Sequence, residues 1–139
     1  MIEQDCKVVS NDLVATDTYL MTLDCPEIAA GTRPGQFVML KVTRNPAADP
    51  LLRRPFSIAG VNARGHLLIL YRVVGRGTRL MAAFRPEDRC WVLGPLGNGF
   101  ALPRKNEGSL LVAGGMGIAP LGFLAQRVDS TRHLFTGYG

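Results

Sequence analysis

The first hundred residues of this chain contain about six short segments with strand character, separated by residues that form turns. Asn11-Asp12 and Asp17 predict breaks near the first two segments, and Asn62-Ala63-Arg64-Gly65 predicts a hairpin connection farther along. This spacing is typical of a small antiparallel barrel or sandwich. The expected strands are Val8–Val14, Tyr19–Asp24, Gln36–Val42, Pro55–Val61, His66–Val74 and Cys90–Leu93.

One helix is expected to interrupt these strands. Thr78 can serve as its N-cap, because a threonine oxygen accepts a hydrogen bond from the first helical turn. Leu80, Met81 and Phe84 give the segment an apolar side, and Pro86 ends it.

A second unit is expected after the polar connector 103–108. Ser109–Ala113 is apolar without alternation, which predicts a strand buried on both faces. Ile118–Val128 has a helical pattern with Pro120 tolerated in its first turn, and His133–Thr136 predicts a second strand. A parallel nucleotide-binding sheet needs several such units, so we expect this one to be incomplete.

Composition and charge exclude several classes of protein. The 139 residues are 47% hydrophobic and 19% charged, which suits one globular domain, or one small domain plus a fragment of a second. The net charge of +5 comes from scattered residues that are not interleaved with aromatic ones, so we expect no nucleic-acid binding. No apolar run approaches the roughly 20 residues that span a bilayer, so we expect no membrane association.

The cysteines and the amino terminus bear on the cellular compartment. Cys6, Cys25 and Cys90 are far apart and lack C-x-x-C spacing, so they predict neither a disulfide framework nor a metal site. We expect reduced thiols. Because Glu3 and Asp5 stand where a signal peptide would be basic, a cytoplasmic location is expected.

The segment Arg54-Pro55-Phe56-Ser57 combines residue types that a purely structural strand does not need. An arginine offers a planar set of donors to a phosphate, and the following proline keeps the chain extended. Phe56 and Ser57 then point to opposite faces, where they can meet different parts of a flat, polar-edged ligand. We interpret the segment as part of a flavin site; the alternative is an arginine on an exposed strand edge.

The segment Gly75-Arg76-Gly77-Thr78 lies where a strand gives way to the expected helix. Small residues let the backbone approach a ligand, and the amino end of a helix presents N–H donors, so the segment predicts a pyrophosphate site. Its alternative is an ordinary glycine turn. Tyr71 and Arg72 could flank the ribose and phosphate, or could form a cross-strand pair on a barrel wall.

Two further glycine-rich segments follow. Gly94–Phe100 has many turn formers and is interpreted as a hinge or a cofactor rim, with a plain interdomain loop as the alternative. Gly114–Pro120 departs from the G-x-G-x-x-G fingerprint and is weak evidence by itself for a dinucleotide site.

The segments RPFS, LYRVVGRGT, GPLGNGF and LLVAGGMGIAPL occur in this order and together cover essentially the whole chain. The ordered set resembles the ferredoxin reductase-like flavoproteins, and is especially similar to the electron-transfer subunits of class B dihydroorotate dehydrogenases. The resemblance implies a mainly β fold: a six-stranded antiparallel Greek-key barrel that binds FAD, over residues 1–102. Residues 103–139 would begin a pyridine-nucleotide-binding α/β domain.

By this resemblance the chain is a flavin-dependent oxidoreductase subunit that passes electrons between NAD(H) and a redox partner. That partner is the dihydroorotate dehydrogenase catalytic subunit of pyrimidine biosynthesis, or another redox protein. The flavin supplies the chemistry, so no general acid, base or nucleophile is assigned. The FAD-binding residues it implies are Arg54, Pro55, Phe56, Ser57, Leu70, Tyr71, Arg72, Gly77 and Thr78. The possible nucleotide-binding residues are Gly114, Gly115, Met116, Gly117 and Pro120.

Two departures from the family concern the carboxyl-terminal half. Family members continue beyond the position of Gly139 and end in a cysteine cluster that binds a 2Fe-2S centre, which three scattered cysteines cannot bind in the same manner. The nicotinamide-binding residues also lie downstream, which puts NAD(H) binding by this chain in doubt. We expect a truncated form or a naturally shortened relative.

Two other functions fit the same motifs. A stand-alone NAD(P)H:flavin or ferredoxin reductase, or a relative from a sulfide dehydrogenase or hydrogenase complex, shares the barrel segments. A non-catalytic flavin- or partner-binding fragment is the third possibility. Because half a sheet leaves apolar edges, we also expect self-association.

Overall fold

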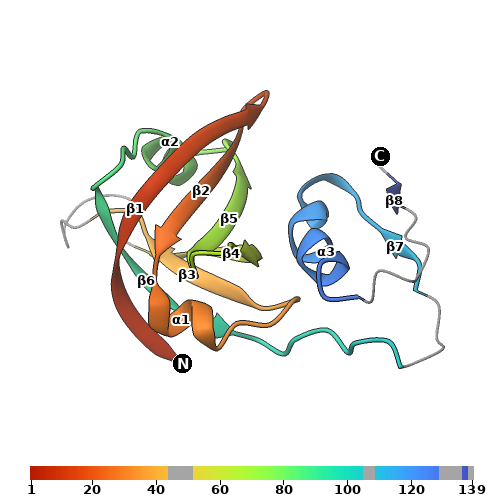
Figure 1. The fold of residues 1–139 in the computed structure, drawn as a ribbon. Coiled ribbons are helices and arrows are strands. Elements are labelled where there is room, and N and C mark those ends of the chain that lie inside the picture. The colour runs from red at the N-terminus through yellow and green to blue at the C-terminus, as the bar shows by residue number, and fades with distance from the viewer. Residues whose placement is uncertain (44–51, 105–108, 129–135, 138–139) are drawn as a thin grey trace.

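The computed structural model describes residues 1–43, 52–104, 109–128 and 136–137. Six antiparallel strands close into a barrel in the order β1-β2-β5-β4-β3-β6, as expected (Figure 1). Consecutive strands β3, β4 and β5 are neighbours and β6 returns to lie beside β3, which is a Greek-key connection. The strands are β1 (Ile2–Ala15), β2 (Thr18–Asp24), β3 (Phe37–Lys41), β4 (Arg54–Val61), β5 (Leu67–Arg72) and β6 (Arg89–Leu96).

The barrel interior is filled by alternate side chains of its strands. In β5 the residues Leu67, Ile69 and Tyr71 are buried, and the residues between them are not. Because side chains of a strand alternate between its faces, this period of two places one apolar row inside. The same alternation supplies Val38 and Leu40 from β3. The sequence pattern therefore sets which face of each strand is buried, and the pairing of β1 with β6 closes the barrel.

The connection between β4 and β5 confirms the predicted hairpin. The Asn62 N–H donates to the carbonyl of His66 at 3.0 Å, and the Gly65 N–H donates to the carbonyl of Asn62 at 2.9 Å. Gly65 has a φ of +80°, which glycine adopts without steric cost. The Asn62 Oδ1 accepts the N–H groups of Arg64 and His66, both at 3.0 Å.

The expected break at Asn11-Asp12 is wrong, because both residues lie inside β1. The turn is formed at Thr16 and Asp17, where Asp17 has a φ of +51°. Asn11 stays in the strand because its amide bonds to α2 (Arg76–Ala82) and β5, two elements remote in the sequence. A side chain that is satisfied by tertiary contacts no longer favours a local turn.

Strand β6 runs farther than expected and includes Gly94, Pro95 and Leu96. A Cβ at Gly94 would lie 2.6 Å from Cγ1 of Val38 on the neighbouring strand β3. Glycine is needed there for close approach of two strands, and the interpretation of these residues as loop is wrong. Gly97 leaves the strand with a φ of +76°.

Two short helices lie at opposite ends of the barrel (Figure 1). Helix α1 (Pro26–Ala30), which the sequence reasoning missed, has proline in its first turn and buries Ile28 and Ala29. Helix α2 (Arg76–Ala82) begins earlier than expected. Its N-cap is Gly75 in an extended conformation, and Thr78 is the third helical residue. The expectation that Thr78 is the N-cap is therefore wrong.

The carboxyl-terminal unit contains strand β7 (Leu111–Val112), the 3₁₀ turn η1 (Gly115–Gly117), helix α3 (Ile118–Ala125) and strand β8 (Thr136–Gly137), which pairs in parallel with β7. Helix α3 packs along β4, and its Phe123 joins the barrel core (Figure 1). Pro120 lies in the first turn of α3 as predicted. Val112 is 70% exposed, so β7 is not buried on both faces. Most of the expected strand 133–136 lies outside the described residues.

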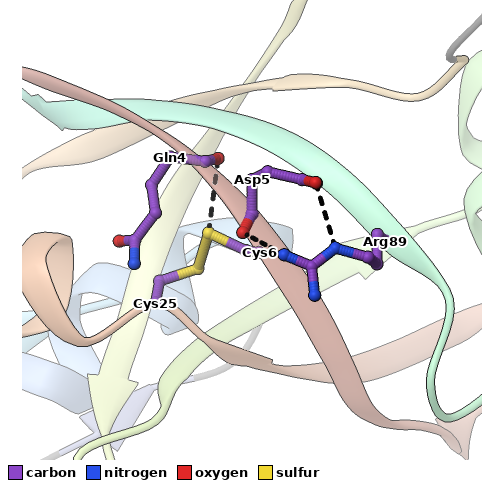
Figure 2. Close-up of polar contacts among 5 residues, drawn as sticks. All are labelled: Gln4, Asp5, Cys6, Cys25 and Arg89. Carbon is purple, nitrogen blue, oxygen red and sulfur yellow. Dashed lines mark hydrogen bonds and ion pairs between the residues drawn. A yellow bond between two sulfur atoms is a disulfide. The ribbon is translucent and has the colours of Figure 1, made fainter.

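Cys6 and Cys25 form a disulfide between β1 and the start of α1, with their Cα atoms 5.2 Å apart (Figure 2). The expectation of three reduced thiols is therefore wrong for this pair, whereas Cys90 is a buried thiol outside the disulfide. The β1–β2 register pairs Lys7 with Asp24. Cys6 precedes Lys7 on β1 and Cys25 directly follows the end of β2, so the two cysteines also lie opposite each other. Beside the disulfide, the Arg89 Nε donates to Asp5 Oδ2 at 3.0 Å (Figure 2).

Candidate functional site

Arg54 and Gly77, from the two predicted phosphate-binding segments, are in direct proximity. Arg54 begins β4 and Gly77 lies in the first turn of α2, and the barrel brings these elements together at one end. A Cβ built on Gly77 would lie 2.9 Å from Nε and 3.3 Å from Cδ of Arg54. Only a residue without a side chain lets the arginine lie across the helix start in this way. The two segments therefore lie next to each other.

The guanidinium of Arg54 is half-buried, and its Nη1 donates to the carbonyl of Leu52. A guanidinium carries five N–H donors in a plane, and this bond uses one of them. In a helix that begins at Arg76, the N–H groups of the first turn have no carbonyl one turn earlier to bond. Arginine and helix start thus offer donors to the same region.

The hydroxyl of Thr78 shapes the turn before α2. Its Oγ1 accepts the N–H groups of Val74 at 2.9 Å and Gly75 at 3.0 Å, and it donates to the carbonyl of Gly75 at 3.0 Å. The residue is 8% exposed. Thr78 therefore holds the loop before α2, and its hydroxyl is already occupied by backbone partners.

The charges around the helix start favour an anion. Helix α2 carries Arg76 and Arg79 and has no acidic residue in its first turn. Arg72, exposed at the end of β5, adds a third positive side chain near the loop that leads to the helix. An anion near a helix start gains from both the side-chain charges and the partial positive charge of the backbone.

Strand β4 presents the other predicted residues on its two faces. Phe56 lies on the inner side with Arg54 and is half-buried, whereas Pro55 and Ser57 are exposed on the other side. The ring of Phe56 meets the ring of Tyr71 edge-on, with centroids 6.0 Å apart. The alternation that the sequence predicted for Phe56 and Ser57 is therefore present.

Tyr71 is a buried part of the barrel wall, 2% exposed, and stacks on its cross-strand partner Tyr19 with centroids 5.6 Å apart. Burial raises the pKa of Tyr71 to about 12, so its hydroxyl stays protonated and donates to Oδ1 of Asn11 at 3.0 Å. Leu70 is half-buried beside it and Arg72 is exposed. Little of the Tyr71 surface is open to a ligand, and its predicted ligand contact stays a prediction.

The glycines of the second unit border open space. Gly114 caps η1, Gly115 has a φ of +52°, and a Cβ at Gly114, Gly115 or Gly117 would meet no atom within 4 Å. Turn η1 approaches β5 and α3 packs along β4, the two strands that carry most of the predicted flavin residues. Met116 and Pro120 are half-buried beside the glycines. The glycines of the predicted nucleotide-binding segment therefore border open space, and the turn that contains them lies near β5.

Segment Gly94–Phe100, interpreted as a hinge or cofactor rim, is tied to the turn before β3. The Phe100 N–H donates to the carbonyl of Pro34 at 2.8 Å, and the Gln36 Nε2 donates to the carbonyl of Gly97 at 3.0 Å. A Cβ at Gly35 would lie 2.8 Å from the Phe100 nitrogen. These contacts position the chain as it leaves the barrel.

Across residues 1–43, 52–104, 109–128 and 136–137, no group of three or more His, Cys, Asp or Glu side chains gathers to hold a metal ion. In those segments no helix has the length and apolar character needed to cross a bilayer.

Comparison with known proteins places this geometry in a family. Residues 5–100 match the family model described as the oxidoreductase FAD-binding domain. The electron-transfer subunit of dihydroorotate dehydrogenase B (NAD(+)) from Desulforamulus reducens is 44% identical over 135 residues, which are 96% of this chain and 51% of that protein. The corresponding subunit from Geobacillus thermodenitrificans is 46% identical over 124 residues, 87% of this chain and 48% of that protein. The chain thus spans about half the length of these curated relatives.

Solved structures give the same fold. The NADH-dependent reduced ferredoxin-NADP oxidoreductase superposes with a TM-score of 0.78 at 28% identity, covering 96% of this chain and 48% of that one. The ferredoxin reductase of carbazole 1,9a-dioxygenase superposes with a TM-score of 0.84 at 23% identity, covering 99% of this chain and 43% of that one. With a matching family model, a closed six-stranded barrel and an arginine lying across a glycine-lined helix start, the chain belongs to the FAD-binding domain family of oxidoreductases.

Proposed function

We propose that this chain binds FAD with its diphosphate between the Arg54 guanidinium and the backbone N–H groups at the start of α2. The observation that carries the proposal is the 2.9 Å separation between Arg54 Nε and the position a Cβ would take on Gly77. It supports the proposal because a site for a diphosphate needs charge and close backbone approach at one place. Phe56, Ser57, Leu70, Tyr71 and Arg72 extend the proposed site toward the flavin ring and the ribose.

Substitution of Arg54 by alanine tests this proposal. Hydrogen bonds to charged groups contribute about 1.5–3 kcal/mol each, so R54A should raise the Kd for FAD about tenfold to a hundredfold. The matched control is Arg64→Ala, which removes an exposed arginine at the opposite end of β4. Binding is measured by quenching of flavin fluorescence. If R54A and R64A bind FAD as the unmodified chain does, Arg54 does not hold a phosphate.

We further propose that the protein is the electron-transfer subunit of an NAD-dependent dihydroorotate dehydrogenase. The support is the similarity to two such subunits, at 44% and 46% identity, over almost all of this chain. Bound flavin would accept two electrons and release them one at a time. The residues of this chain would bind and orient it, and Gly114, Gly115, Met116, Gly117 and Pro120 would begin the NAD(H)-binding region beside β4 and β5.

Co-expression with a dihydroorotate dehydrogenase catalytic subunit tests the partner. Co-purification in a fixed ratio, and dihydroorotate-dependent bleaching of the FAD bands in the complex, are the expected results. Failure of the two chains to associate while FAD still binds would remove the partner assignment and leave the flavin site intact. Reduction of the bound FAD by NADH, measured anaerobically, tests the nucleotide region separately.

The remaining assignments concern domains, location and assembly. We propose a barrel domain at 1–102 and a nucleotide-binding unit at 103–139, a cytoplasmic location, and no binding to membrane or nucleic acid. Disulfides are uncommon in reducing compartments, so the redox state of Cys6 and Cys25 in cells tests the location. Self-association is proposed because Leu110 and Val112 are 72% and 70% exposed beside β7; light scattering that shows only monomer would refute it.

The alternative function is a stand-alone or complex-associated ferredoxin or flavin reductase. It is supported by the barrel shared with an NADH-dependent reduced ferredoxin-NADP oxidoreductase at 28% identity. The higher identity to the dihydroorotate dehydrogenase subunits favours the first assignment. FAD-dependent reduction of ferredoxin, without association with a dihydroorotate dehydrogenase catalytic subunit, would favour the second.

A further inference from the structure

Asn11 connects three elements of the barrel through one half-buried side chain. It lies inside β1, and its Nδ2 donates to the carbonyl of Met81 at 2.8 Å and to that of Phe84 at 3.2 Å. Its Oδ1 accepts the hydroxyl of Tyr71, on β5, at 3.0 Å. The amide nitrogen and the amide oxygen of Asn11 therefore both form hydrogen bonds, each with a different part of the chain. The sequence reasoning did not identify this residue as functional.

The Met81 carbonyl lies in the last turn of α2 and also accepts the N–H of Phe84 at 3.0 Å, whereas the Phe84 carbonyl lies two residues past the end of the helix. Asn11 donates to both carbonyls from 70 and 73 positions earlier in the chain and so bonds to the carboxyl end of α2 and to the residues that follow it. Met81 is one turn beyond Gly77, about 6 Å along the helix axis. A short helix moves as one body, so the bonds at Met81 and Phe84 also set where Gly77 lies relative to Arg54.

The hydrogen bond from Tyr71 to Asn11 positions the aromatic rings of Tyr71, Tyr19 and Phe56. The hydroxyl of Tyr71 is fixed by Asn11, and its ring stacks on Tyr19 and meets Phe56 edge-on. Phe56 lies on the inner side of β4, as does Arg54. The phenol donates a hydrogen bond, which only the amide oxygen of Asn11 can accept. This orients the amide nitrogen toward the carbonyls of Met81 and Phe84. One residue thereby aligns the helix start and the aromatic side of the same site.

We propose that Asn11 is a positioning residue of the FAD site: it holds α2 and Tyr71 in the arrangement that brings Gly77 and Arg54 together and supports Phe56. The proposal rests on the proposed function, because the site it positions is the proposed FAD site.

Substitutions at Asn11 separate its two roles. Asn11→Asp keeps an acceptor for Tyr71 but loses both donations to α2, whereas Asn11→Ala loses all three bonds. Because the hydrogen bonds to α2 set the helix position, N11D and N11A should each raise the Kd for FAD about tenfold. The control is Ser10→Ala, a change on the same strand as Asn11. It removes a hydrogen bond to Thr22 on β2 and does not involve α2. S10A should bind FAD as the unmodified chain does.

A double variant distinguishes positioning from general destabilisation. If Asn11 acts through Arg54 and Gly77, the variant N11A/R54A should bind FAD no more weakly than R54A alone, because one interaction has been removed twice. The visible circular dichroism of bound FAD should also change in N11D and not in S10A, since it reports how the ring is held. Urea unfolding of each apoprotein shows whether it is folded under the conditions of the titration.

The outcomes are separable. An unmodified chain that binds no FAD overturns the proposed function, and the positioning role with it. An unmodified chain that binds FAD while N11D and N11A match S10A overturns the positioning role alone. Affinity losses of N11A and R54A that multiply in the double variant also overturn it. If N11A does not fold, N11D and Tyr71→Phe test the proposal instead. Y71F should raise the Kd for FAD two- to fivefold, because it removes the hydrogen bond to the Asn11 amide oxygen.

Discussion

Replacement of Gly77 by alanine separates ligand binding from folding more sharply than any other single change. The new methyl group would lie 2.9 Å from Nε and 3.3 Å from Cδ of Arg54, whereas ordinary contact between such atoms begins near about 3.5 Å. Something must move by about half an ångström, and the arginine side chain moves more easily than the helix. The guanidinium then leaves the position from which it would bond a phosphate.

G77A is expected to change the free energy of unfolding and the free energy of FAD binding in opposite directions. Alanine stabilises a helix relative to glycine by about 0.5–1 kcal/mol, so the apoprotein should unfold at the same or slightly higher urea concentration. Loss of charged hydrogen bonds costs about 1.5–3 kcal/mol of binding, which corresponds to a Kd for FAD raised about tenfold to a hundredfold. G77A is therefore expected to be as stable as the parent and to bind FAD poorly.

The assay pairs fluorescence titration of FAD with urea unfolding of the apoprotein. The control is Gly122→Ala in α3, where a Cβ would meet no atom within 4 Å. It makes the same chemical change in a helix and should leave FAD binding unchanged. Unchanged FAD affinity in G77A would refute a shared phosphate site at Arg54 and Gly77. A large loss of stability in G77A would show that this contact is structural packing.

Two further predictions concern stability. The disulfide between Cys6 and Cys25, 19 residues apart, should stabilise the fold by about 3 kcal/mol. Cys25→Ala should show this loss by urea unfolding, and three titratable thiols in denatured, never-reduced protein would show that the bond is absent. Burial raises the pKa of Tyr71 from 10.0 to about 12, so the folded state favours the neutral phenol. Its contribution is fully present below pH 10 and is lost as the pH rises through about 12, a total of about 2–3 kcal/mol. Tyr71→Phe should remove that alkaline slope, and an unchanged slope would contradict the assignment.

Local patterns were sufficient to predict most of the barrel. Alternating apolar residues in Leu67–Arg72 and the turn residues Asn62 and Gly65 act through neighbours in the sequence, so their structural outcome could be predicted. The predictions for Asn11 and Thr78 were wrong for the opposite reason. Asn11 bonds to a helix 70 positions away, and Thr78 bonds back to a loop whose extended Gly75 takes the N-cap position.

The disulfide also could not be predicted from neighbours in the sequence. Cys6 and Cys25 are opposite each other only because β1 and β2 pair in a register that continues from Lys7 and Asp24. That register depends on the turn at Thr16 and Asp17, where the sequence indicated Asp17 but also a second break at Asn11-Asp12 that the structure lacks. Spacing in the sequence alone therefore did not indicate a cross-link.

The sequence by itself determined which residues are equipped for phosphate and flavin chemistry: an arginine before a proline, an aromatic residue beside a serine, and glycines at a helix start. Whether Arg54 and Gly77 could act together was decided only by the tertiary structure. They lie on β4 and α2, and their approach depends on barrel closure and on the contacts of Asn11 that set the position of α2. Residue chemistry is a local property, whereas convergence at one site depends on strand order and packing between segments remote in the chain.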